Sequence, residues 1–184
     1  MATFENINKL LLCDVKNPQG RGIDYVNAVV VNGRAYTVGH MSAQPFRVLD
    51  TATNRQTLTK YANVDKRIDC GMLDMGFSGS SYQIADPEID DKVRLNSVDY
   101  DPKNGSLMSR SLLGEIIGKY TLPNGYTEFA LIVHNPDTNI RLTCGSAVVN
   151  NDGKLLGILN KASTDSDIVL FAPMIDVISF MECL

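Results

Sequence analysis

Cys144 has the local sequence of a reactive thiol at a turn. It is followed by Gly145 and Ser146 and then by an apolar, β-like run. Turn backbone can direct N–H groups at a developing oxyanion, and a glycine lets a substrate approach closely. A free cysteine that packs as a small apolar side chain would show the same local sequence. Chemistry at Cys144 therefore depends on a second residue that can activate the thiol.

The chain contains two histidines, His40 and His134. Each one ends a β-like run, where a side chain can project into a cleft. An imidazole titrates near neutral pH and can take a proton from a thiol. A structural histidine is the alternative at either place, and position along the chain does not decide between the two.

A carboxylate stands in the apolar run of residues 67–75. Asp69 needs a partner there, because burial of an unpaired carboxylate is costly. A histidine N–H is one such partner. Pairing with Arg67, or a place on a solvated edge, is the alternative. Asp65 and Asp74 compete for the same role.

Together, His40, Asp69 and Cys144 supply the groups of a catalytic triad. The chemistry needs a thiol nucleophile, an imidazole that takes its proton and a carboxylate that orients the imidazole. The three residues are 29 and 75 positions apart along the chain. Elements that are distant in the sequence must therefore bring them together.

Turn signals divide the middle of the chain into short strands. Asn-Gly and Asp-Gly pairs begin at residues 32, 104, 124 and 152 and tolerate the positive φ angles of tight hairpins. The predicted strands are residues 25–31, 34–39, 46–49, 57–61, 67–75, 112–120, 126–133, 146–150, 154–159 and 168–171. Many short strands at regular spacing predict two antiparallel barrels or a sandwich.

Both ends of the chain show the apolar spacing of a short helix. The N-terminal face is formed by Phe4, Ile7, Leu10 and Leu11. The C-terminal face is formed by Ile175, Ile178 and Met181, after a proline that suits a helix start. The boundary between two β-units is predicted within residues 76–110, which gives an N-terminal unit of residues 1–90 and a C-terminal unit of residues 91–184.

Composition indicates a soluble globular protein. The 184 residues are 44% hydrophobic and 21% charged. The net charge of −4 excludes attraction of the whole protein to nucleic acid, although a local basic patch remains compatible with it. No apolar run is long enough for a membrane span, and the N-terminus lacks the pattern of a signal peptide. The four scattered cysteines, without a CxxC pair, predict reduced thiols and no structural zinc.

Four stretches of this sequence resemble chymotrypsin-fold viral cysteine proteases, especially the 3C-like proteases of picornavirus-like viruses. Residues 36–40 resemble the strand that ends in the catalytic histidine, and residues 69–73 resemble the strand that opens with the acid. Residues 143–146 and 153–158 resemble the nucleophile loop and the hairpin after it. The resemblance covers about residues 30–160. It implies an all-β fold of two antiparallel six-stranded β-barrels with short terminal helices.

The resemblance implies a cysteine endopeptidase that processes a viral polyprotein in the cytoplasm of the host cell, without a metal or organic cofactor. His40 would activate Cys144, Asp69 would orient His40, and the backbone N–H groups of Cys144 and Leu142 would bind the oxyanion. The family has glycine at the position of Leu142, so the conformation of this loop is expected to differ.

The resemblance also implies a set of substrate contacts. A strand near the nucleophile would bind an extended peptide through its main chain. Leu159 replaces a histidine that reads glutamine in many family members, so we expect no such readout unless His134 reaches the same pocket. The expected contacts are His134, Asn139, Leu159, Asn160, Lys161 and Ala162.

Lys92 and Arg94 lie where picornaviral 3C proteases carry an RNA-binding motif. Four acidic residues between positions 86 and 91 precede them, and a solvated connector would have the same composition. On the resemblance, viral RNA is a second expected partner, and a solvated connector is the alternative. The alternatives for the whole chain are an RNA-binding or structural β-barrel without activity, and a structural β-sandwich with incidental histidine and cysteine.

Overall fold

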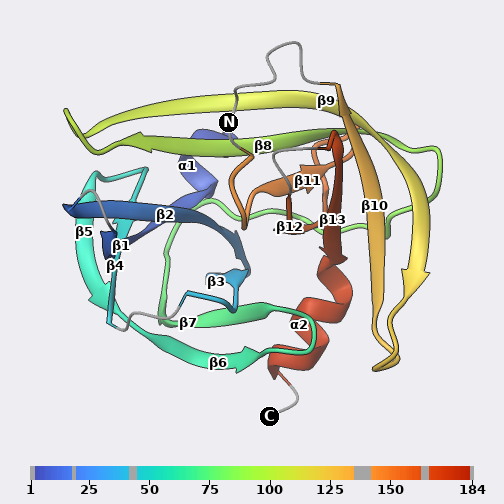
Figure 1. Cartoon of the computed structure of the whole chain (residues 1–184), viewed down its shortest axis with the longest axis horizontal. Coiled ribbons are helices and arrows are strands. Elements are labelled where there is room, and N and C mark those ends of the chain that lie inside the picture. Colours follow the sequence, from blue (N-terminus) through green and yellow to red (C-terminus); the bar gives the residue numbers. More distant parts are fainter. Residues whose placement is uncertain (1–2, 18–19, 42–44, 135–141, 163–165, 183–184) are drawn as a thin grey trace.

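Two β-units lie against each other in the computed structural model (Figure 1). The structure describes residues 3–17, 20–41, 45–134, 142–162 and 166–182. Every ladder between its named strands is antiparallel. The predicted all-β architecture is confirmed.

The N-terminal unit is one seven-stranded sheet in the order β5-β4-β1-β2-β3-β7-β6. Its strands are β1 (Lys9–Asn17), β2 (Gly20–Val31), β3 (Arg34–Val38), β4 (Phe46–Asp50), β5 (Arg55–Thr59), β6 (Tyr61–Asp65) and β7 (Cys70–Gly76). The C-terminal unit is a closed barrel in the order β10-β13-β12-β11-β8-β9. Its strands are β8 (Lys92–Asp101), β9 (Ser106–Thr121), β10 (Thr127–His134), β11 (Ala147–Val149), β12 (Leu155–Lys161) and β13 (Ile168–Pro173).

The expectation of six strands and a closed barrel holds for the C-terminal unit and is corrected for the N-terminal one. No ladder joins β5 to β6 among the described residues. Lys60 separates the two strands, and β5 pairs with β4 while β6 pairs with β7. The run predicted as one strand over 57–61 therefore serves both ends of an open sheet. The rings of Phe46 and Tyr61 pack edge to face at this corner, with centroids 4.9 Å apart.

The N-terminal helix is shorter than its apolar spacing predicts. Helix α1 spans Phe4–Ile7, and the chain then enters β1. Leu11 packs into the largest core cluster while Leu10 and Leu12 pack into another. Both faces of this strand are buried, which explains why leucine occupies three consecutive positions. The run resembles the apolar spacing of a helix, which is why the sequence predicts a longer one.

The C-terminal helix exists, but its buried face is rotated from the predicted one. Helix α2 spans Met174–Glu182 and buries Met174, Val177 and Met181. Ile175 is 49% exposed, so its place on the core face was wrong. The three buried residues repeat at intervals of three and four, which is the spacing of one helix face.

The segment predicted to hold the boundary contains a long hairpin. Strands β8 and β9 pair from Lys92 with Glu115 to Asp101 with Ser106. Along β8, Val93 and Leu95 are buried, whereas Lys92 and Arg94 are exposed. The charged residues hid this alternation in the sequence, and the interpretation of residues 92–94 as a connector was wrong.

One core joins the two units. Ala147, Val149, Leu155 and Ile158 belong to barrel strands but pack with the N-terminal sheet. The interior of the barrel holds a separate cluster that includes Leu131 and Phe171. Each fully buried leucine or isoleucine contributes about 1.5–3 kcal/mol to stability. The shared cluster therefore fixes how the two units sit together.

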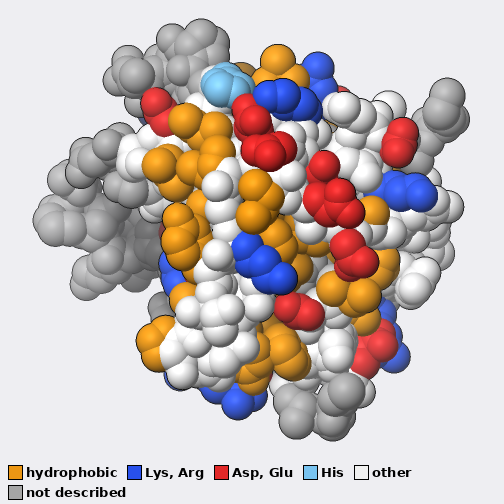
Figure 2. All heavy atoms as spheres, turned by 90° about the vertical axis from the view of Figure 1, so that its right-hand side faces the viewer, with side chains coloured by type: hydrophobic (Ala, Val, Ile, Leu, Met, Phe, Trp, Pro, Cys, Tyr) orange, Lys and Arg blue, Asp and Glu red, His pale blue; other side chains and the backbone are white. Residues whose placement is uncertain are grey.

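The outer face of β9 carries exposed apolar side chains. Leu113, Ile117 and Tyr120 are between 42% and 54% exposed. Figure 2 views the side formed by β9 and β10 and shows apolar side chains among charged ones of both signs. Within the described residues, no helix has the length and apolar character needed to cross a membrane.

Candidate active site

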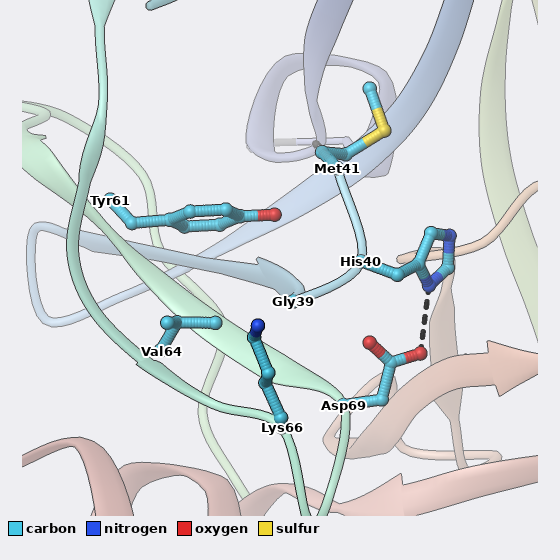
Figure 3. A pocket seen from close by; sticks show the side chains of 7 residues that line it. All are labelled: Gly39, His40, Met41, Tyr61, Val64, Lys66 and Asp69. Atoms are coloured by element: carbon cyan, nitrogen blue, oxygen red, sulfur yellow. Dashed lines mark hydrogen bonds and ion pairs between the residues drawn. The ribbon is translucent and has the colours of Figure 1, made fainter. Parts of the chain in front are cut away.

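His40 is positioned by a close approach of two strands. Strand β3 ends at Val38, and a Cβ on Gly39 would lie 2.8 Å from a Val64 methyl and 3.1 Å from Cys70 O. Glycine at this position lets the end of β3 pass beside the start of β7. His40 Nδ1 then lies 2.7 Å from Asp69 Oδ2. Figure 3 shows the two side chains pointing toward one another.

Asp69 lies in the turn between β6 and β7, directly before Cys70. Its φ angle is +51°, a left-handed conformation that aspartate tolerates better than most residues. Gly39 N donates to Asp69 O at 3.0 Å. Of the competing carboxylates, Asp65 binds Arg67 at 2.8 Å and Asp74 is exposed on β7. The structure therefore brings His40 to Asp69.

The ion pair of Asp65 with Arg67 holds the base of this turn and predicts a pH-dependent stability. Hydrogen bonds from the Arg67 side chain keep the pKa of the Asp65 carboxyl below its usual value. A carboxyl whose pKa is lower in the folded than in the unfolded state stabilises the fold at pH values above its unfolded-state pKa of about 3.9. This contribution is lost as the pH falls through the folded-state pKa. Asp65→Asn should lower the free energy of unfolding by about 1 kcal/mol at pH 7. Urea denaturation should show this difference shrinking below about pH 3.9; an equal difference at pH 7 and pH 3 would contradict the ion-pair explanation.

Cys144 lies at the turn that precedes β11, as its local sequence predicted. This turn is bonded to both units: Asn27 N donates to Cys144 O at 2.8 Å, and Gly145 N donates to Leu159 O at 2.7 Å. Gly145 has a φ angle of +83°, and a Cβ there would lie 1.8 Å from Asn27 O. Glycine is required because the backbone of β2 comes this close, whereas the sequence had suggested close approach of a substrate.

The side chain of Asn27 binds strand β8 of the barrel. It is fully buried on β2. Its Nδ2 donates to Val98 O at 2.7 Å, and its Oδ1 accepts from Val98 N at 2.8 Å. In the same region Thr143 Oγ1 donates to Asp99 Oδ1 at 2.7 Å, and Arg110 pairs with Asp99 at 2.9 Å. Buried polar groups that are bonded in this way fix the turn on the barrel.

Asn160 links the turn of Asp69 to the turn of Cys144. Its Nδ2 donates to Ile68 O at 3.1 Å, and its backbone O lies 4.0 Å from Cys144 Sγ. Ile68 immediately precedes Asp69, which contacts His40. A continuous set of contacts therefore connects the imidazole, the carboxylate and the thiol across the two units.

A cavity of about 520 Å³ adjoins the pair of His40 and Asp69 (Figure 3). Burial raises the pKa of the Tyr61 phenol, which stays protonated and donates to Val38 O at 2.5 Å. The cavity has room for a side chain of a molecule bound at His40. Its lining residues are Gly39, His40, Met41, Tyr61, Val64, Lys66 and Asp69.

The three cysteines that the structure describes differ in accessibility. Cys13 and Cys70 are buried, and Cys144 is partly exposed. Burial raises the pKa of the Cys70 thiol well above its ordinary value. A buried thiol with a raised pKa is a poor nucleophile. Within the described part of the chain, no three His, Cys, Asp or Glu side chains are grouped to hold a metal ion.

Two residues expected at the oxyanion and substrate sites face the barrel core. Leu142 is partly buried and packs against the barrel cluster. Leu159 is fully buried in that cluster, its N–H donates to Ser146 O, and its C=O accepts from Gly145 N. Its backbone groups bind the nucleophile turn and its side chain packs in the core, and contact of Leu159 with a substrate stays a prediction. The two predicted oxyanion donors stay a prediction.

The other residues predicted to contact substrate differ in solvent exposure. Asn160 is 2% exposed and its side chain faces Ile68, so only its backbone adjoins Cys144. Lys161, Ala162 and His134 are exposed, and Asn139 lies outside the described residues. Their contacts with a substrate stay predictions.

The predicted RNA contacts lie on the exposed face of β8. Lys92 Nζ pairs with Glu115 Oε2 at 2.7 Å, and Arg94 donates to Ser111 Oγ at 3.4 Å. The pairing of Lys92 offsets part of the positive charge at this place. RNA binding by Lys92 and Arg94 stays a prediction.

Sequence reasoning missed Glu128, which is 1% exposed on β10. Its carboxylate accepts from Asn160 Nδ2 at 3.2 Å and from Lys161 Nζ at 3.1 Å. The available signal was the one used for Asp69, a carboxylate inside an apolar run. Glu128 is separated from Asn160 by 32 residues, so its partner was not visible in the sequence.

Comparisons with known proteins identify the fold. No protein-family model matches the chain, and no curated protein matches it. The Rv3671c protease from M. tuberculosis, in its active form, matches with a TM-score of 0.71 and 13% identity over 95% of this chain and 79% of that one. The fold is chymotrypsin-like.

Two further structures of the same bacterial protease agree. Its inactive form has a TM-score of 0.68 and 11% identity over 96% of this chain and 88% of that one. A serine-to-alanine mutant in the inactive form has a TM-score of 0.67 and 12% identity over 95% and 86%. At this level of identity the chymotrypsin-like similarity establishes architecture, and activity must be argued from the site.

Proposed function

We propose that this chymotrypsin-like protein is a cysteine endopeptidase. The observation that carries the proposal is the 2.7 Å contact of His40 Nδ1 with Asp69 Oδ2, joined through Asn160 to the turn of Cys144. Covalent acyl transfer requires a nucleophile, a base that takes its proton and a group that orients the base, and Cys144, His40 and Asp69 supply these three groups. The similar solved structures are proteases, which supports the same reaction class.

A thiol serves this site better than a hydroxyl. Ser146, the serine beside the turn, is fully buried and its hydroxyl donates to Thr143 O. Cys144 is partly exposed and adjoins β12. The bacterial protease is a serine protease, one of whose structures carries a serine-to-alanine mutation. The proposed nucleophile of this chain is a cysteine and differs from it in that respect.

The reaction follows from these groups. His40 takes the thiol proton of Cys144, and the thiolate attacks the carbonyl carbon of the scissile peptide bond. The tetrahedral oxyanion accepts hydrogen bonds from backbone N–H groups of the nucleophile turn. As the C–N bond breaks, His40 gives its proton to the leaving amine. Water then loses a proton to His40 and attacks the thioester, which releases the new carboxyl group and restores the thiol.

The substrate class follows the resemblance to 3C-like proteases. We infer that the substrate is an extended segment of a viral polyprotein, cleaved in the cytoplasm of the host cell. Exposed residues at the end of β12, Lys161 and Ala162, would offer main-chain groups to such a segment. The cavity beside His40 would receive one of its side chains.

The proposal predicts selective alkylation of one thiol. Iodoacetamide should modify Cys144 at least about tenfold faster than Cys13 or Cys70, because thiolate character and access set the rate. His40→Ala should slow the reaction at Cys144 toward the rate of an ordinary exposed thiol. The rates are measured by peptide mass spectrometry between pH 5 and pH 9, in a Cys183→Ser background that removes the cysteine outside the described residues.

The same samples connect the thiol to the activity. Unmodified protein should cleave a peptide library, and protein alkylated at Cys144 should not. His134→Ala is the matched control, since His134 is exposed at the end of β10 and should leave alkylation of Cys144 unchanged. Equal and slow modification of every thiol, or cleavage that survives full modification of Cys144, would contradict the cysteine mechanism.

A further inference from the structure

Asn160 occupies a β-bulge next to the nucleophile. On β12, Leu159 pairs with Phe171 and Lys161 pairs with Leu170, so Asn160 is an extra residue in the ladder. A bulge redirects the side chain of the extra residue. Leu159 packs into the barrel cluster, whereas Asn160 reaches Ile68 of the N-terminal sheet.

The amide of Asn160 has one possible orientation. Its neighbours Ile68 O, at 3.1 Å, and Glu128 Oε1, at 3.2 Å, can only accept hydrogen bonds. Nδ2 must therefore face both of them. Oδ1 is buried and has no hydrogen-bond partner among the described residues. An unpaired buried acceptor costs about 1–3 kcal/mol, so this orientation is maintained against a local cost.

Glu128 and Lys161 hold the amide from the other side. The buried Glu128 carboxylate lies 3.1 Å and 3.3 Å from Lys161 Nζ. The side chain of Lys161 is about half exposed. An ion pair with one half-exposed partner contributes little to stability, because water screens it. Its structural effect here is to provide a charged acceptor that keeps Nδ2 of Asn160 in place.

The two peptide groups on either side of the Asp69 Cα are both held. Ile68 O accepts from Asn160 Nδ2 and lies 3.4 Å from Cys70 Sγ, and Asp69 O accepts from Gly39 N at 3.0 Å. The φ and ψ angles of Asp69 define how these two peptide planes are oriented relative to each other. The angle φ is +51°, a conformation that needs support from its surroundings. These bonds therefore direct the carboxylate at His40.

We propose that Asn160 is a positioning residue that acts through Asp69. Its side chain is held by Glu128 and joins the turn of Asp69 to β12, the strand that adjoins Cys144. The pair of His40 and Asp69 on one sheet therefore keeps a constant position relative to Cys144 on the other. This inference rests on the proposed peptidase function and deepens it. Asn160 does not touch the reacting atoms with its side chain.

A double-mutant cycle tests the proposal on the full chain. Asn160→Ala should lower kcat about 10- to 100-fold, with KM changed by less than about threefold, because a small misplacement of a catalytic group costs about this much. In an Asp69→Ala background the same substitution should lower kcat by less than about threefold, since the residue it acts through is gone. A merely structural role would give the same loss in both backgrounds.

Two further variants keep the test decisive. Asn63→Ala is the matched control: it removes a bond from an asparagine Nδ2 to Met181 O, 3.0 Å long, between β6 and α2, and should leave kcat within about twofold. If Asn160→Ala does not fold, Asn160→Ser replaces it, because one hydroxyl hydrogen cannot serve both acceptors. Equal losses in both backgrounds, or no loss in either, would overturn the role of Asn160. Absence of cleavage by the wild-type protein would instead overturn the proposed function.

Discussion

Replacing Cys144 by alanine is expected to lower kcat for peptide cleavage by about 10⁴- to 10⁶-fold. Alanine cannot form the covalent acyl intermediate, so only binding and backbone donors remain to act on the substrate. The fold should persist, because Cys144 is partly exposed and its backbone bond from Asn27 N does not involve the side chain. The measurement is steady-state cleavage of a peptide found by library digestion.

Controls separate lost chemistry from lost structure. Thermal unfolding of Cys144→Ala should match that of the wild-type protein. Cys13→Ala removes a buried thiol from the core between the units and should leave kcat within about twofold. If Cys144→Ala retains more than about a hundredth of the activity, the assignment of Cys144 as nucleophile is wrong.

Replacing Gly145 by alanine should cost at least about 3 kcal/mol of the free energy of unfolding and should abolish activity. The new Cβ would lie 1.8 Å from Asn27 O, which is backbone and has no free rotation by which to move away. Relief requires separation of β2 from the nucleophile turn, and this breaks the bond from Asn27 N to Cys144 O. Urea denaturation monitored by tyrosine fluorescence and circular dichroism gives the change in stability.

Gly125→Ala isolates the cost of the clash from the cost of the backbone conformation. Gly125 has a φ angle of +87°, close to the +83° of Gly145, but nothing lies within 4 Å of a Cβ placed there. The control should therefore lose only the conformational strain of about 1–2 kcal/mol. Similar losses for the two variants would show that β2 does not hold the nucleophile turn as described.

The contact between His40 and Asp69 could be predicted from the sequence. A chain with two histidines leaves few candidates for a catalytic base, and the structure brings His40 to Asp69 as expected. Residue types alone left Asp65, Asp69 and Asp74 as alternatives, and only the family resemblance selected Asp69. In the structure the choice depends on where Arg67 goes, and Arg67 pairs with Asp65.

Other features were hidden because the sequence signal was ambiguous. The leucines at 10–12 imitate a helix face, and charges obscure the alternation in β8. Leu159 resembled a substrate contact by position, but it faces the barrel core. The bulge at Asn160 was not visible in the sequence either, because one extra residue in a ladder changes which of the following side chains face the interior.

By itself, the sequence determined the short strands of the middle of the chain, most of their turns and the residue types available for acid–base and thiol chemistry. These properties depend on neighbours a few positions apart, through side-chain alternation and the φ angles that glycine and asparagine tolerate. Only the tertiary structure decided the open N-terminal sheet, the role of Gly145 and the contact of Asn160 with Ile68. Those contacts join residues up to 118 positions apart, since the packing of one unit on the other creates them.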